Sequence, residues 1–156
     1  MKDFPSSDEL WARYVREKGL DSEQEAIISY PYYTTPTGKK PRYYQRIAVN
    51  RMVEAIAKGQ KRLLVVMATG TGKTFTAFQV IYRFWKTRTK KKVLYLADRN
   101  ILIDQTISKD FKPFGDAMEK INNRRINTAK DIYLGLYQQL KTADTDYYKQ
   151  LPRDFF

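Results

Sequence analysis

A run of apolar residues that leads into a glycine-rich turn constrains the fold of this chain more than any other feature. The run is Leu63–Met67, and the turn after it places Gly70 and Gly72 before Lys73 and Thr74. A short apolar run that ends at a turn predicts a buried strand. Glycine allows the backbone to adopt positive φ angles and to approach a ligand closely. The segment therefore predicts a strand, a tight loop and a helix that begins near Lys73.

The same loop predicts a site for phosphate groups. Backbone N–H groups in such a turn converge on an anion, and the N-terminus of the following helix adds a partial positive charge. Lys73 would reach the β- and γ-phosphates of a nucleoside triphosphate, and the Thr74 hydroxyl would be a ligand of Mg²⁺. These two residues are the catalytic candidates. The candidate nucleotide-binding residues of the loop are Thr69, Gly70, Thr71, Gly72, Lys73 and Thr74.

Residues at two positions bear on which kind of phosphate-binding loop this is. Met67 stands where the usual eight-residue phosphate-binding motif has its first glycine. A dinucleotide-binding turn would need a third glycine where Phe75 stands, so that alternative fails. A glycine-rich turn that binds no ligand is the simplest remaining alternative.

The chain is strongly basic. Its 29 Lys and Arg residues exceed its 17 Asp and Glu residues, which gives a formal net charge of +12. Such an excess favours a polyanionic partner, most simply the phosphates of a nucleic acid. An acidic protein or a membrane surface is the alternative. The basic residues gather at positions 39–42, 58–62, 86–92 and 124–125.

Cysteine and histidine are both absent from the sequence. Their absence excludes disulfides, thiolate metal sites and histidine-based catalysis within this stretch. The first twenty residues are too polar for a signal peptide, and no apolar run approaches the length of a membrane span. We therefore expect a soluble cytoplasmic protein without a membrane partner.

Apolar periodicity along the chain predicts an α/β fold with a parallel sheet, whose ligands would bind at the carboxyl ends of the strands. Strands are expected at Leu63–Met67, 93–97 and 132–137. Helices are expected from the Ser6–Glu9 capping box to Gly19, from Ser22, over 43–58, after the glycine-rich loop, and from Arg99 to about Ser108.

Five segments carry a resemblance to a known family: 8–14 (DELWARY), 41–45 (PRYYQ), 67–74 (MATGTGKT), 96–105 (LADRNILIDQ) and 110–115 (DFKPFG). Together they resemble a superfamily 2 helicase motor, and more narrowly the restriction (R) subunit of type I restriction–modification enzymes. The resemblance covers nearly the whole chain. It implies a P-loop NTPase fold with a partial RecA-like sheet. Residues 41–156 would be the front part of the first RecA-like lobe, and residues 1–40 a helical and loop connector.

The resemblance also implies roles for single residues. Arg42 and Gln45 would lie beside the adenine of ATP, because a side-chain amide can pair with adenine N6 and N7. Alternatively, Gln45 only begins a helix. Arg99 and Gln105 would bind DNA, with Arg99 on a backbone phosphate; alternatively, Arg99 pairs with a nearby carboxylate. Asp98 is expected to cap a helix rather than to act as a catalytic acid.

The sequence departs from the family pattern in two places. Leu136 stands where many such motors carry a DNA-contacting threonine. The sequence also ends at Phe156, before the Asp-Glu-x-His box, the second motor lobe and the nuclease carboxylates that the family would supply. The resemblance thus implies an incomplete lobe that lacks the Walker B strand and is inactive alone. We expect an exposed sheet edge and poor stability.

The function implied by the resemblance is ATP-dependent translocation of double-stranded DNA within a type I restriction endonuclease. ATP and Mg²⁺ are the implied cofactors, and methyltransferase and specificity subunits are the implied partners. The alternatives are another superfamily 2 helicase or remodeller, and a non-catalytic module that binds nucleotide or nucleic acid. A small-molecule kinase with a P-loop would explain neither the basic charge nor Arg99.

Overall fold

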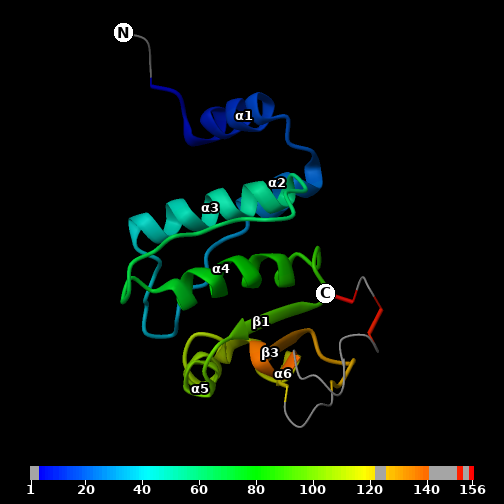
Figure 1. Cartoon of the computed structure of the whole chain (residues 1–156). Helices are drawn as coiled ribbons and strands as arrows, with labels where there is room; N and C mark the ends of the chain where they lie inside the picture. Colours follow the sequence, from blue (N-terminus) through cyan, green and yellow to red (C-terminus); the bar gives the residue numbers. More distant parts are fainter. Residues whose placement is uncertain (1–3, 122–125, 141–150, 153–154) are drawn as a thin grey trace.

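The computed structural model describes residues 4–121, 126–140, 151–152 and 155–156. The helices before the first strand are α1 (Ser7–Lys18), α2 (Ser22–Ser29), α3 (Tyr43–Ala57) and α4 (Lys73–Lys86). The elements that follow are β1 (Val93–Ala97), α5 (Asn100–Ser108), the 3₁₀ helix η1 (Lys112–Ala117), β2 (Met118–Lys120), β3 (Ile132–Leu136) and α6 (Tyr137–Leu140). Figure 1 shows α1, α3 and α4 in successive layers above the strands. Among the described residues, no helix has the length and apolar character needed to cross a membrane.

The sheet is parallel, with strand order β1-β3-β2. β3 lies in the centre, where Ile132 pairs with both Val93 of β1 and Met118 of β2. Burial of β3 from Ile132 to Gly135 fits a central strand of a parallel sheet. The predicted α/β class and the strand at 93–97 are confirmed, and the strand predicted at 132–137 ends one residue earlier. The three-residue strand β2 was not predicted.

Aromatic and aliphatic side chains from α4, α5, η1 and β3 form the main core. Phe75 and Phe78 lie three residues apart on α4, so they share one face of the helix. The Phe78 ring lies 5.9 Å from that of Phe111 and 5.3 Å from that of Phe114, measured between ring centroids. Leu134 brings β3 into the same cluster. The core thereby fixes the start of α4 relative to the sheet.

The N-terminal helices begin where the polar sequence signals predict. Ser6 and Glu9 form a reciprocal capping box, and Gly19 ends α1 with a φ of 61°. The helix that starts at Ser22, as predicted, is capped by Asp21 in a capping box with Gln24. Aspartate accepts the N–H of the first turn as readily as serine does.

The segment before α3 is attached to α4 by buried polar contacts. The Gln79 side-chain amide accepts from the Tyr33 backbone N–H at 3.0 Å and donates to the Tyr33 carbonyl at 2.9 Å. Arg83 donates to the carbonyl of Ile28 and to the Asn50 side chain, and burial lowers the pKa of its guanidinium. Since the Gln79 and Arg83 side chains are buried, these hydrogen bonds offset part of their desolvation penalty. The attachment holds the segment from Ile28 to Tyr33 against α4, the helix of the glycine-rich loop.

α1 contacts α3 at Glu54, whose carboxylate lies beside Tyr14 and 3.8 Å from Lys18 Nζ. The Tyr14 hydroxyl donates to the Glu54 carboxylate at 2.8 Å. Burial, together with that carboxylate, raises the pKa of Tyr14 to about 12. The hydrogen bonds from Lys58 and Tyr14 lower the pKa of Glu54. Tyr14 and Glu54 are therefore a hydroxyl and a carboxylate across the whole neutral pH range.

The prediction of a strand at Leu63–Met67 is wrong. The residues are extended but form no part of the sheet, and the side chains alternate in exposure, with Leu64 90% and Val66 86% exposed. Residues Leu63–Val66 line a hollow beside α3, together with Ala48 and Met52. A strand exists only when a neighbouring strand satisfies its N–H and C=O groups. No described strand lies beside this segment, so its apolar pattern alone does not make it one.

Candidate nucleotide-binding site

The glycine-rich loop lies between this extended segment and the start of α4. Gly70 has a φ of 79° and Gly72 a φ of 86°. Both values fall in the left-handed region, which strongly favours glycine. Gly72 is the N-cap of α4, so Lys73 and Thr74 belong to its first turn. The predicted order of loop and helix is confirmed, and the positive end of the helix dipole lies at the loop.

Thr71 and Lys73 donate hydrogen bonds to the loop's own carbonyl groups. Lys73 Nζ donates to the carbonyls of Met67 and Ala68, each at 3.2 Å. The Ala68 carbonyl also accepts from Thr71 Oγ1 at 2.7 Å and from the Thr71 N–H at 3.3 Å. A phosphate oxygen is a stronger acceptor of such hydrogen bonds than a neutral carbonyl, because its charge assists them. These contacts are therefore of a kind that an anion can replace.

Gln45 connects the first turn of α3 with the loop. Its side chain is buried, and Nε2 donates to the Thr71 carbonyl at 2.7 Å. Its Oε1 accepts from the backbone N–H of Arg42 at 2.9 Å. A Cβ atom at Gly72 would lie 2.4 Å from Gln45 Nε2, so the two segments touch closely. Gln45 does begin a helix, as one of the two alternatives held; its contact with adenine stays a prediction.

Tyr44 makes a second contact with the same carbonyl. Its hydroxyl donates to the Thr71 carbonyl and accepts from Arg42 Nη1, both at 3.3 Å. The exposed Arg42 guanidinium is thus linked to the loop through Tyr44, and its contact with adenine stays a prediction. Sequence reasoning missed Tyr44. The available signal was its position directly before Gln45 at the start of a predicted helix.

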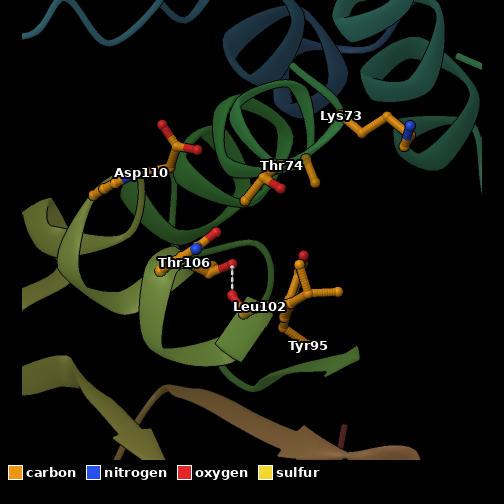
Figure 2. Close-up of a pocket in the computed structure, with 9 residues that line it drawn as sticks. Lys73, Thr74, Tyr95, Leu102, Thr106 and Asp110 are labelled. Carbon is orange, nitrogen blue, oxygen red and sulfur yellow. Dashed lines mark hydrogen bonds between the residues drawn. The ribbon is translucent and has the colours of Figure 1, made fainter. Parts of the chain in front are cut away.

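A cavity of about 430 Å³ lies between α4 and α5 (Figure 2). Figure 2 shows Thr74 and Asp110 beside it, while the Lys73 side chain extends away from Thr74. The Thr106 hydroxyl donates to the Leu102 carbonyl at 2.7 Å. The residues that line the cavity are Lys73, Thr74, Ala77, Tyr95, Leu102, Gln105, Thr106, Lys109 and Asp110. The cavity brings the predicted metal ligand and the predicted DNA contact Gln105 to one surface.

The donor set at this cavity fits Mg²⁺ only in part. The Thr74 hydroxyl is a hard oxygen ligand of the kind Mg²⁺ prefers, and the Asp110 carboxyl group lines the same cavity. Within the part of the chain that the structure describes, no three acidic, histidine or cysteine side chains come together. Mg²⁺ would therefore depend on substrate phosphate oxygens for much of its coordination. Sequence reasoning missed Asp110, although it opens one of the family-like segments.

The predicted DNA-binding residue Arg99 lies just after the carboxyl end of β1. Its side chain is 77% exposed and has Asp98 within 3.9 Å, a long ion pair in solvent. Exposed pairs of this kind contribute little to stability, so the guanidinium stays available. The N-cap position of α5 is Arg99 rather than Asp98, which corrects the prediction that Asp98 caps this helix. Leu136 pairs with Ala97, so Leu136 and the Ala97–Arg99 segment lie at the same carboxyl end of the parallel strands.

A family model and two relatives that match this chain all describe restriction enzymes. The family model described as "Type III restriction enzyme, res subunit" matches residues 38–156. The chain is 51% identical, over its full length, to the type I restriction enzyme EcoAI endonuclease subunit of Escherichia coli, of which it covers 20%. It is 42% identical to the EcoKI endonuclease subunit of E. coli strain K12 over 58% of the chain and 7% of that subunit.

A solved structure shows the same relationship. A fragment described as an HsdR subunit of a type I restriction enzyme from Vibrio vulnificus matches the whole chain with a TM-score of 0.80 and 37% identity, and the match covers 27% of that fragment. The chain spans about a fifth of the length of the EcoAI subunit. It belongs to the restriction-enzyme res-subunit family, and within it to the helicase-like region of the R subunit of type I restriction enzymes, with a partial RecA-like P-loop fold.

Proposed function

We propose that this chain is the ATP-binding front part of a motor that translocates double-stranded DNA, within a cytoplasmic type I restriction endonuclease. The observation that carries the proposal is the loop itself. Two glycines at positive φ lie directly before the first turn of α4, and that turn presents Lys73 and Thr74. Such an arrangement is a ready-made site for the phosphates of a nucleotide.

The residues of the loop would act by binding and orienting the triphosphate. Lys73 would exchange its two carbonyl acceptors for the β- and γ-phosphate oxygens and stabilise the charge that develops on them. The proposed nucleotide contacts are Arg42, Gln45, Thr69, Gly70, Thr71, Gly72, Lys73 and Thr74. Mg²⁺, when bound, would neutralise phosphate charge, with the Thr74 hydroxyl as one ligand. The sequence holds no Asp-Glu-x-His box, so the group that activates water would come from other residues of the protein.

DNA would lie along the carboxyl edge of the sheet. Arg99 is exposed there, and Gln105 follows on α5. A guanidinium on a backbone phosphate positions the duplex without reading its sequence, as a translocating motor requires. The excess of basic residues supports the same partner.

Simple experiments distinguish the proposed function from its alternatives. The EcoAI and EcoKI relatives are subunits of type I restriction enzymes, which supports assembly with methyltransferase and specificity subunits. Co-purification with those subunits would separate a restriction motor from another superfamily 2 helicase. ATP turnover that DNA stimulates would separate either motor from a non-catalytic binding module.

The test of the phosphate contact is Lys73→Ala in the protein at its natural length. We expect this variant to lose ATP hydrolysis and translocation while its melting temperature stays close to that of the unmodified protein, because the exposed Lys73 side chain contacts only loop carbonyls. Lys61→Ala is the matched control, since Lys61 is an exposed lysine just before the extended segment. Near-normal ATP turnover by Lys73→Ala would remove Lys73 from the mechanism.

A further inference from the structure

The carbonyl of Thr71 is held from outside the loop by two donors of α3. Gln45 Nε2 lies 2.7 Å from it and the Tyr44 hydroxyl 3.3 Å. Thr71 itself is only partly buried, and its neighbour Gly72 opens α4. The first turn of α3 therefore fixes the loop at one atom, immediately before the helix that would receive phosphate.

The other polar groups around Thr71 are engaged in a different way. The Thr71 N–H, the Thr71 hydroxyl and Lys73 Nζ all donate to the carbonyl of Ala68. A bound triphosphate would need N–H and ammonium donors, so these bonds must open when it enters. The Thr71 carbonyl belongs to the next peptide group along the chain. It can keep both of its α3 donors while the Thr71 N–H changes its partner.

We infer that Tyr44 is a positioning residue for the triphosphate. Its hydroxyl anchors the Thr71 carbonyl while the hydrogen bonds in the rest of the loop open. The inference rests on the proposed function, because it concerns how the same loop captures ATP. Tyr44 acts through Thr71 and touches no reacting atom. Its removal weakens capture of the triphosphate and leaves the chemical step unchanged.

A competing explanation is that the Tyr44 hydroxyl serves to orient Arg42. The Arg42 Nη1 group donates to the Tyr44 hydroxyl at 3.3 Å, and Arg42 is a proposed contact of the base. If Tyr44 served to orient Arg42, its loss would affect only ligands that carry a base. Inorganic tripolyphosphate carries no base, so binding of this probe separates the two explanations.

The experiment compares Tyr44→Phe with Tyr43→Phe in the protein at its natural length. Tyr43 is 71% exposed, and its hydroxyl has no hydrogen-bond partner among the described residues, so Tyr43→Phe removes the same atom without the contact. Calorimetric titrations with Mg²⁺–ATP and with Mg²⁺–tripolyphosphate give Kd and the number of sites. We expect Tyr44→Phe to raise Kd for both ligands by the same factor, about three- to tenfold, as for loss of one hydrogen bond. Tyr43→Phe should match the unmodified protein.

Steady-state ATP hydrolysis supplies the second readout. Tyr44→Phe should raise KM by a similar factor and leave kcat unchanged. An increase in Kd for ATP alone would assign Tyr44 to the base through Arg42 and overturn the inference. Fewer binding sites at an unchanged Kd would show loss of folded protein and overturn it too, as would an unchanged Kd for both ligands. If the unmodified protein bound neither ligand, the proposed function itself would fail, and the inference with it.

Discussion

Gly72 is the residue on which the contact between the loop and α3 depends. Its φ of 86° is unfavourable for a residue with a side chain, and a Cβ atom there would lie 2.4 Å from Gln45 Nε2. Gln45 cannot move aside freely, because its amide bonds the Arg42 N–H at one end and the Thr71 carbonyl at the other. A side chain at position 72 is therefore disfavoured for two reasons: the backbone φ angle and the close contact with Gln45.

Gly72→Ala should destabilise the protein by about 2–3 kcal/mol. About 1–2 kcal/mol comes from placing a Cβ in the left-handed region, and about 1 kcal/mol from losing the hydrogen bond of Gln45 to Thr71. Gly70→Ala is the matched control, since Gly70 has a similar φ of 79° and no atom within 4 Å of the Cβ position. The measurement is the melting temperature of both variants. Equal losses in the two would show that the contact with Gln45 contributes nothing.

The conformation of the loop could be predicted because it follows from local rules, whereas the roles of its residues stay predictions. Glycines before a lysine and a threonine indicate a turn and a helix start wherever they occur, and the structure places Lys73 at the first position of α4. The role of Tyr44 could not be predicted in this way. Its hydroxyl contacts Thr71, which is 27 positions away in the sequence, and only the fold brings the two together.

The helices and strands that were predicted correctly either satisfy their own backbone hydrogen bonds or pair with another strand. α1 carries its capping box, and β1 pairs along its full length with β3. The segment Leu63–Met67 has the apolar pattern of a buried strand, yet Leu64 and Val66 are almost fully exposed. Periodicity reports which side chains could be buried, whereas strand formation needs a partner that periodicity does not identify. This is the physical reason that this one prediction was wrong.

We expect the exposed segment Leu63–Met67 to promote self-association between copies of the 156-residue chain. Unpaired backbone groups beside apolar side chains are a template for pairing with another copy. Leu64→Lys should therefore increase the monomer fraction, measured by sedimentation velocity, because a charge on an edge opposes such pairing. Gln60→Lys adds the same charge at an exposed position just before the segment. It should have a smaller effect. A monomeric, sharply melting unmodified chain would contradict the expectation of an exposed edge and poor stability.

At the scale of the whole molecule, α2, α3 and α4 share a core. Ile27 of α2, Val49 and Val53 of α3, and Val80 and Phe84 of α4 form one buried cluster. The division into a connector at 1–40 and a lobe at 41–156 stays a prediction. The overall class could be predicted because helix and strand alternate from α4 through β1 to α5. The packing of the first forty residues could not, because contacts such as those of Gln79 with Tyr33 are buried polar pairs without a sequence pattern.

The measurement that tests the central proposal most directly is ATP hydrolysis by the protein at its natural length, with and without linear double-stranded DNA. A motor that uses the Lys73 loop for ATP and the Arg99 edge for DNA should hydrolyse ATP faster when DNA is present. The stimulation should weaken as salt is raised, because phosphate contacts are released by counterions. ATP turnover that is equal with and without DNA, or absent in both cases, would contradict the proposal that this chain belongs to a DNA-translocating motor.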